Sequence, residues 1–216
     1  MQITSDNIFI EAQNGNISIL EHPLATKEMD YVGWFPLHYL SFSFCDLDKR
    51  NFEKKNKDLL TILKHPEIET LKSSTGNTPL HILGFYGIFE ILDHIGTYQA
   101  FNDACCTPLH YLATFYSDYR NRQSIVYPNY FKRNTCIFLN LPEIETLKDK
   151  EENTPLHEFV RVFDNFNIDK KIRIYLRKKF KEKYFWFDVG KKRITQETVT
   201  EIIKCSKAER FVLGCL

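Results

Sequence analysis

The sequence has little glycine and little proline, with eight of each among 216 residues, and it has no long polar tract. These shortages argue against a disordered linker inside the chain. No apolar run approaches the roughly 20 residues that span a bilayer, so we expect no transmembrane helix. The first residues contain neither a basic region nor a long apolar core, so we expect no secretory signal peptide.

Cysteine motifs are also missing. Six cysteines are present, but none belongs to a Cys-X-X-Cys motif, and the adjacent pair Cys105–Cys106 lacks the spacing of zinc ligands. We therefore expect reduced thiols, which are typical of cytosolic proteins. The sequence predicts a cytoplasmic protein without a metal or a cofactor.

The net charge of +1 conceals two regions of opposite sign. Residues 1–166 contain 15 Lys and Arg against 22 Asp and Glu, whereas residues 167–216 contain 14 against 6. Such a shift in charge indicates a boundary between two parts of a chain. We predict one domain over residues 1–166, followed by a basic segment over residues 167–216.

One motif recurs four times. A Pro-Leu-His triplet begins at Pro36, Pro79, Pro108 and Pro155. The residue 13 positions before each proline ends a short apolar run. The segment PEIETLK occurs unchanged in the second and fourth copies, at residues 66–72 and 142–148. The sequence thus predicts a repeated unit, consisting of an apolar helix, a loop and a second helix that opens with Pro-Leu-His.

Threonine precedes three of the four triplets, and the resulting tetrapeptide suits the start of a helix. Threonine is a favourable N-cap because its hydroxyl accepts a backbone N–H of the first turn. Proline at the first helical position loses no hydrogen bond. We expect the histidine to tie the loop to the helix start. Phe35 precedes the first triplet, so we expect that cap to be lost at a cost of about 1 kcal/mol.

These units resemble the ankyrin repeat, whose pattern reads TPLHxAAxxGHxEIVxLLL. The segment Thr78–Leu92, TPLHILGFYGIFEIL, matches it well, with Gly87 at the turn between the helices. The resemblance covers roughly residues 7–165 and implies an all-α solenoid of helix pairs. We expect long inter-helix insertions near residues 45–57 and 117–134, and a helical cap formed by residues 167–216.

The turn inside the loop differs between the copies. Gly33 and Gly76 occupy it in the first two copies, and Cys105 and Glu152 occupy it in the last two. If the turn needs a positive φ, then the last two copies are expected to use another turn.

The repeat accounts for all seven histidines. Four belong to the triplets, and the other three each lie 16 residues before one of the first three triplet histidines. Structural roles are therefore expected for all of them. With no phosphate-binding glycine loop and no serine nucleophile motif, we predict no catalytic residue and no metal ligand.

In the ankyrin pattern, the two positions after TPLHxAA face a concave surface. Aromatic residues are frequent there, which indicates an exposed binding stripe unless the insertions or the C-terminal segment cover it. The second insertion adds tyrosine and arginine, which are favoured at interfaces or, alternatively, serve only to pack the loop. The predicted partner-binding residues are Phe42, Phe85, Tyr86, Phe115, Tyr119, Arg120, Arg122 and Arg161.

The predicted function is non-catalytic binding of another protein, as an adaptor or an inhibitor. A composition rich in Phe, Asn, Lys and Ile is typical of an AT-rich genome, and action on host proteins in the host cytosol is one interpretation of it. A first alternative is nucleic-acid binding through the basic segment. The residues predicted for it are Lys170, Lys171, Arg173, Arg177, Lys178 and Lys179. A second alternative is an enzyme with its activity in residues 167–216.

Overall fold

The computed structural model describes residues 3–45, 52–118, 134, 137–138 and 140–161. These residues form helices and loops, with no β-strand among them, so the all-α prediction is confirmed. The chain divides into two units, Met1–Phe115 and Tyr116–Leu216. Within the described residues, no helix has the length and apolar character needed to cross a membrane.

The first unit is built from short helices in pairs. In chain order the described helices are α1 (Ile8–Gln13), η1 (Ile17–Glu21), η2 (Pro23–Ala25), α2 (Pro36–Phe42), η3 (Ser43–Cys45), α3 (Phe52–Leu63), α4 (Pro79–Phe85), η5 (Phe89–Asp93), α5 (Gly96–Gln99) and α6 (Pro108–Asp118). Helix α6 starts in this unit and ends in the second. The helices labelled η are 3-10 helices, which are common in short pieces.

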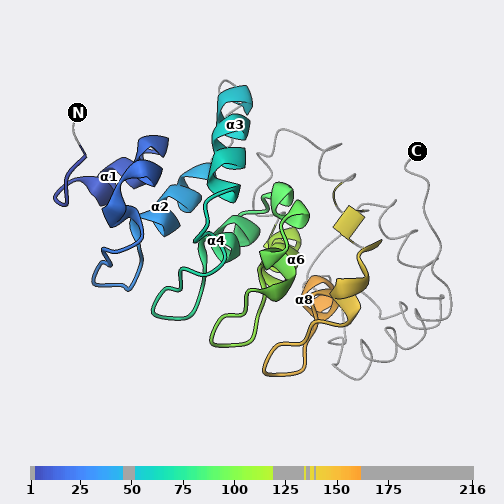
Figure 1. Cartoon of the computed structure of the whole chain (residues 1–216). Helices are drawn as coiled ribbons and strands as arrows, with labels where there is room; N and C mark the ends of the chain where they lie inside the picture. The colour runs from blue at the N-terminus through green and yellow to red at the C-terminus, as the bar shows by residue number, and fades with distance from the viewer. Residues whose placement is uncertain (1–2, 46–51, 119–133, 135–136, 139, 162–216) are drawn as a thin grey trace, which may run out of the picture. The chain divides into compact units, whose positions relative to one another are not determined.

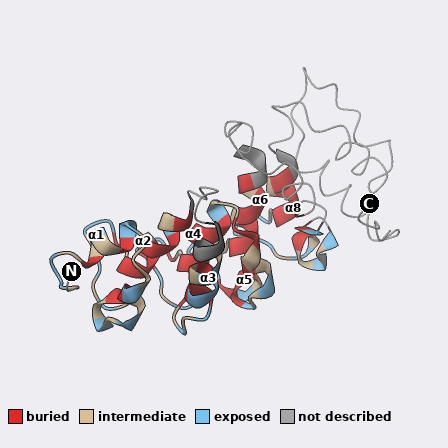
Figure 2. Ribbon diagram, turned by 90° about the horizontal axis from the view of Figure 1, so that it is seen from above, coloured by how far each residue is buried: buried red, intermediate tan, exposed pale blue. Residues whose placement is uncertain are grey.

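In the first unit, helices α2, α4 and α6, which open with Pro-Leu-His, follow one another in space in sequence order (Figure 1). Helix α1 contacts α2, and α2 contacts α4. Helix α4 also lies close to α6. A Cβ atom added to Gly84 of α4 would be only 2.5 Å from the carbonyl oxygen of Pro108 in α6. Leu37, Leu80 and Leu109, one from each opening turn, are fully buried. Figure 2 shows that buried residues gather on these helices, so neighbouring pairs cover one another's apolar faces.

All four triplets begin an α-helix, as the repeat predicts; the fourth begins α8 (Pro155–Arg161) in the second unit. Of the apolar runs before the first three triplets, two form the 3-10 helices η1 and η5, and the other ends α3. The turn between α4 and η5 uses Gly87 with a φ of 74°. A side chain there would collide with the Phe115 ring, 2.1 Å from the Cβ position, which explains the glycine.

The predicted insertions have different outcomes. The first, near residues 45–57, is shorter than expected because α3 already begins at Phe52. Residues 52–57 lengthen α3, the second helix of its pair, and are not part of a loop. Most of the second insertion and the whole predicted cap, residues 167–216, lie outside the described residues.

The described part of the second unit contains one more joint between helices. It consists of η6 (Pro142–Glu145), a loop and α8. Ile144 and Leu156 are fully buried, and the rings of Phe138 and Phe159 lie 5.6 Å apart. The apolar run before the loop and the helix after it therefore share one core.

Candidate protein-interaction surface

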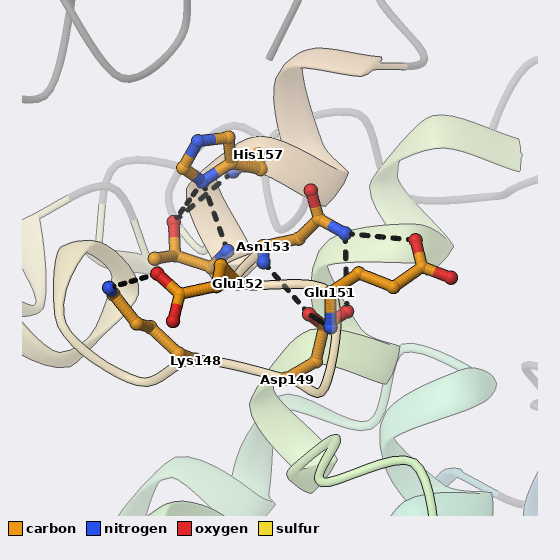
Figure 3. A network of polar contacts seen from close by, with 7 residues as sticks. Lys148, Asp149, Glu151, Glu152, Asn153 and His157 are labelled. Carbon is orange, nitrogen blue, oxygen red and sulfur yellow. Dashed lines mark hydrogen bonds and ion pairs between the residues drawn. The ribbon is translucent and has the colours of Figure 1, made fainter. Parts of the chain in front are cut away.

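Each loop before a triplet is closed by a polar side chain six residues ahead of the proline. These residues are Asp30, Ser73, Asn102 and Asp149. In every loop the side-chain oxygen accepts the backbone N–H groups two and four residues later, at 2.8–3.4 Å. Figure 3 shows the copy in which Asp149 binds Glu151 and Asn153. Polar side chains of this kind commonly mimic a backbone turn.

The turn that was expected to differ is the same in all four loops. Gly33, Gly76, Cys105 and Glu152 have φ values of 86°, 74°, 58° and 66°. The expectation of another turn at Cys105 and Glu152 was therefore wrong. The shared side-chain and backbone hydrogen bonds hold these two residues in the left-handed region, where a side chain costs roughly 1–2 kcal/mol.

In the first two copies, the triplet histidine joins its own helix start to the next loop. In His81, Nδ1 accepts the backbone N–H of Thr78 at 3.0 Å, and Nε2 lies 3.0 Å from the carbonyl oxygen of Cys106. An amide N–H can only donate, so the proton of this imidazole is on Nε2, which donates to Cys106. His38 repeats the arrangement, with Phe35 at 3.3 Å and Asn77 at 2.9 Å.

His110 and His157 accept the amides of Thr107 and Thr154 in the same way, at 3.1 and 3.0 Å. The threonine cap predicted from the sequence is found at Thr154, whose hydroxyl accepts the His157 amide at 3.4 Å. At the first triplet, Phe35 provides no hydroxyl but keeps the bond from its amide to the histidine. The histidine is thus common to all four helix starts, whereas the hydroxyl is not.

Burial explains the protonation state of these histidines. The low-dielectric surroundings disfavour the imidazolium and lower the pKa of His38 and of His81 to about 4, although each bond to a backbone oxygen opposes the shift. Both are therefore neutral at pH 7, as their hydrogen bonds require. The remaining histidines, His22, His65 and His94, accept the backbone N–H two residues later, at 3.0–3.3 Å.

Four aromatic rings from three successive helices form a continuous row on the first unit. This aromatic row consists of Phe42 at the end of α2, Phe85 and Tyr86 at the end of α4, and Tyr111 in α6. Ring centroids are 5.2 Å apart for Phe42–Tyr86, 5.2 Å for Tyr86–Phe85 and 6.2 Å for Phe85–Tyr111. Each pair is edge-to-face. Phe42 and Phe85 remain 38% and 37% exposed, whereas Tyr86 and Tyr111 are half-buried.

Hydrogen bonds join two tyrosines to the loops: Tyr111, which belongs to the aromatic row, and Tyr39, which lies on α2 outside it. The Tyr111 hydroxyl donates to Asn77 Oδ1 at 2.9 Å and accepts from Asn102 Nδ2 at 3.1 Å. On α2, the Tyr39 hydroxyl donates to the Asp30 carboxylate, and burial together with this carboxylate raises the pKa of Tyr39 to about 12. Rings held in this way lose little conformational entropy when a partner binds.

The structure brings together only part of the predicted partner-binding set. Phe42, Phe85 and Tyr86 lie side by side, but Phe115 is 8% exposed and packs over Gly87, so it does not belong to the exposed row. Tyr119, Arg120 and Arg122 lie outside the described residues, as does the side chain of Arg161 in the last position of α8. The basic residues predicted to bind nucleic acid also lie outside them.

Sequence reasoning missed Tyr111. It directly follows a triplet histidine, and Tyr39 holds the same position in the first copy. A reading of the position after each histidine would have found both. Searches found no matching protein-family model and no matching curated protein, so the likeness to ankyrin repeats rests on the chain's own residues.

Among the described residues, no group of three or more His, Cys, Asp or Glu side chains is arranged to hold a metal ion. The arrangement that these residues do present is a partly exposed aromatic row, which the hydrogen bonds of Tyr111 join to two loops. Its chemistry suits contact with another macromolecule through ring faces and loop acceptors.

Proposed function

We propose that the chain is an ankyrin-repeat protein that binds another protein without catalysis, as an adaptor or an inhibitor. The aromatic row carries this proposal. Aromatic residues are enriched among the few interface residues that supply most of the binding energy. A contiguous apolar patch that remains exposed on a folded surface commonly marks an interaction site.

Support for the ankyrin assignment comes from the joints. Four helix starts share one histidine arrangement, and four loops share one set of turn hydrogen bonds. In the first unit, the His38 and His81 rings also bond to the following loop. A repeat in which each copy binds the next is the construction principle of a solenoid, which offers an extended binding face.

We further propose a cytoplasmic location, with the host cytosol as the alternative for a pathogen or viral protein. The basis is cysteine usage: the Cys105 and Cys106 thiols are not joined in a disulfide. Nucleic-acid binding by the basic C-terminal residues stays a prediction, and no described observation favours it over protein binding.

A photo-cross-linking experiment tests the proposed surface. Benzoyl-phenylalanine is placed at position 85 in the aromatic row and, as a matched control, at position 101. Both positions hold phenylalanine, and they are 37% and 40% exposed. In cell extract, position 85 is expected to cross-link one defined protein that position 101 does not. Equal products at both positions, or none at position 85, would count against the proposal.

A further inference from the structure

The described part of the first unit is strongly acidic. Residues 3–45 and 52–115 contain twelve Asp and Glu, six Lys and no Arg. Four of the lysines lie in α3 or directly after it, at Lys54, Lys55, Lys57 and Lys64. The other described residues of this unit contain only two lysines, Lys27 and Lys72. Because acidic residues outnumber basic ones there, the surface attracts cations.

Hydrogen-bond acceptors lie in the loops that two tyrosines contact, one outside the aromatic row and one within it. Asp30 is bound to Tyr39, and Asn77 Oδ1 is bound to Tyr111. Asp103 is exposed in the third loop, and its carboxylate lies 2.5 Å from the position that a Cβ on Gly76 of the second loop would take. An acceptor therefore lies at the Tyr111 end of the aromatic row, and carboxylates lie in the neighbouring loops.

The geometry of the rings suits a planar cation. Tyr86 is nearly perpendicular to Phe42 and to Phe85, with interplanar angles of 86° in both pairs. Successive rings thus turn their faces in different directions instead of forming one flat apolar sheet. The face of an aromatic ring is electronegative and attracts a guanidinium, which can stack on it while its N–H groups bind acceptors at the side.

We infer that the occupant of the aromatic row is a basic segment of the partner protein, whose arginine side chains stack on Phe42 and Phe85. This inference rests on the proposed function and adds the chemistry of the partner. The acidic loops steer the segment toward the surface, and the rings select arginine over a mobile ammonium group. A nucleic acid is a poor occupant here, because its phosphates would meet a net negative surface.

Peptide selection on the full chain tests the inference. A library of random 12-residue peptides is selected against the wild type, Phe85→Leu and Phe101→Leu. Phe85→Leu keeps an apolar side chain but removes the ring, and Phe101 is an equally exposed phenylalanine outside the row. Urea unfolding checks that both variants remain folded. We expect arginine-rich peptides from the wild type and from Phe101→Leu, with binding to Phe85→Leu weakened about three- to fivefold.

Replacement of each arginine in the selected peptide by citrulline provides the second measurement. Citrulline keeps the shape and loses the charge, and we expect about a tenfold loss of affinity for the wild type when all arginines are replaced. Arginine peptides that bind Phe85→Leu unchanged would indicate bulk attraction and overturn the inference. Failure to enrich any peptide would also overturn the inference.

The two proposals can fail separately. Selected peptides that depend on Phe85 but contain no arginine would overturn the inference and leave the proposed function intact. A cross-linked partner whose contact segment is not basic would have the same meaning. Failure of cross-linking at position 85 would instead remove the proposed function.

Discussion

The two copies of PEIETLK can be compared residue by residue, because they lie in separate units and lead to different loops. Ile68 and Ile144 are 1% and 0% exposed. The amides of Leu71 and Leu147 donate to Glu67 and Glu143 at 3.0 and 3.1 Å. The same seven residues thus bury the same isoleucine and form the same bond twice, although Pro142–Glu145 is a 3-10 helix and residues 66–70 are turns.

The loops after the two copies differ in sequence but not in geometry. The first has Ser73 and Gly76, and the second has Asp149 and Glu152, yet each makes the same turn. The turn therefore depends on an acceptor six residues before the proline, and glycine only makes it less strained.

Low pH should cause the largest loss of stability, because it protonates the histidines that join one repeat to the next. On folding, the pKa of His38 and of His81 falls from 6.5 to about 4, so the unfolded chain binds protons first as the pH drops. Stability is thus fully present above pH 6.5 and is lost between pH 6.5 and 4. From pH 7 to 5 we expect a loss of about 3–4 kcal/mol, measured by urea unfolding. A flat profile over this range would show that these imidazoles accept protons in the folded state.

Removal of one bridging histidine should cost nearly as much. His81→Ala leaves the Thr78 amide and the Cys106 carbonyl without their partner and opens a cavity. We expect a loss of about 3 kcal/mol in the free energy of unfolding. His65→Ala is the control, because His65 is only half-buried and makes one local bond at 3.2 Å. Equal losses for both variants would contradict the bridging role.

Substitutions at the turn residues Gly76 and Glu152 should separate the effect of backbone strain from the effect of side-chain contacts. Gly76→Ala should destabilise the protein by about 2 kcal/mol, because φ is 74° and the new Cβ would lie 2.6 Å from the Asp103 backbone nitrogen. Glu152→Gly should stabilise it by about 1 kcal/mol, because φ there is 66° and glycine relieves the strain. Urea unfolding measures both. Destabilisation by Glu152→Gly would mean that its side chain matters more than its backbone.

The smallest effect is expected at the end of the duplicated segment. Lys148 pairs with Glu152 at 2.6 Å, and both side chains are more than half exposed (Figure 3). Lys148→Met should therefore change stability by less than about 0.5 kcal/mol, because exposed ion pairs contribute little. Lys72→Met is the matched control, since Gly76 offers no carboxylate at the corresponding position. A difference above about 1 kcal/mol between the two would show that the pair fixes the turn.

The sequence predicted the parts of the fold that depend on local chemistry. All four helix starts were found, because proline and histidine have fixed roles there. The turn at Cys105 and Glu152 was mispredicted, because the deciding acceptors, such as Asn102 and Asp149, differ in residue type between copies. Because these acceptors are aspartate, serine or asparagine, the sequence did not reveal that all of them lie six residues before the proline.

The candidate site was predicted less completely than the fold. Phe42, Phe85 and Tyr86 were identified from their positions in the repeat, but ring contacts between helices depend on tertiary packing. Packing buries Phe115 over Gly87 and brings Tyr111 into the row instead. Both residues lie on α6, and their contacts with Phe85 and Gly87 decide which of them joins the row.

The affinity of the cross-linked partner for paired variants tests the central claim most directly. Phe85→Ala combined with Tyr86→Ala removes the middle of the aromatic row, and Phe101→Ala is the control outside it. Isothermal titration calorimetry should show a loss of at least ~2 kcal/mol for the double variant, because both rings act as hot spots, and almost none for the control. If the double variant stays folded and binds as tightly as the wild type, the partner binds elsewhere and the claim is wrong.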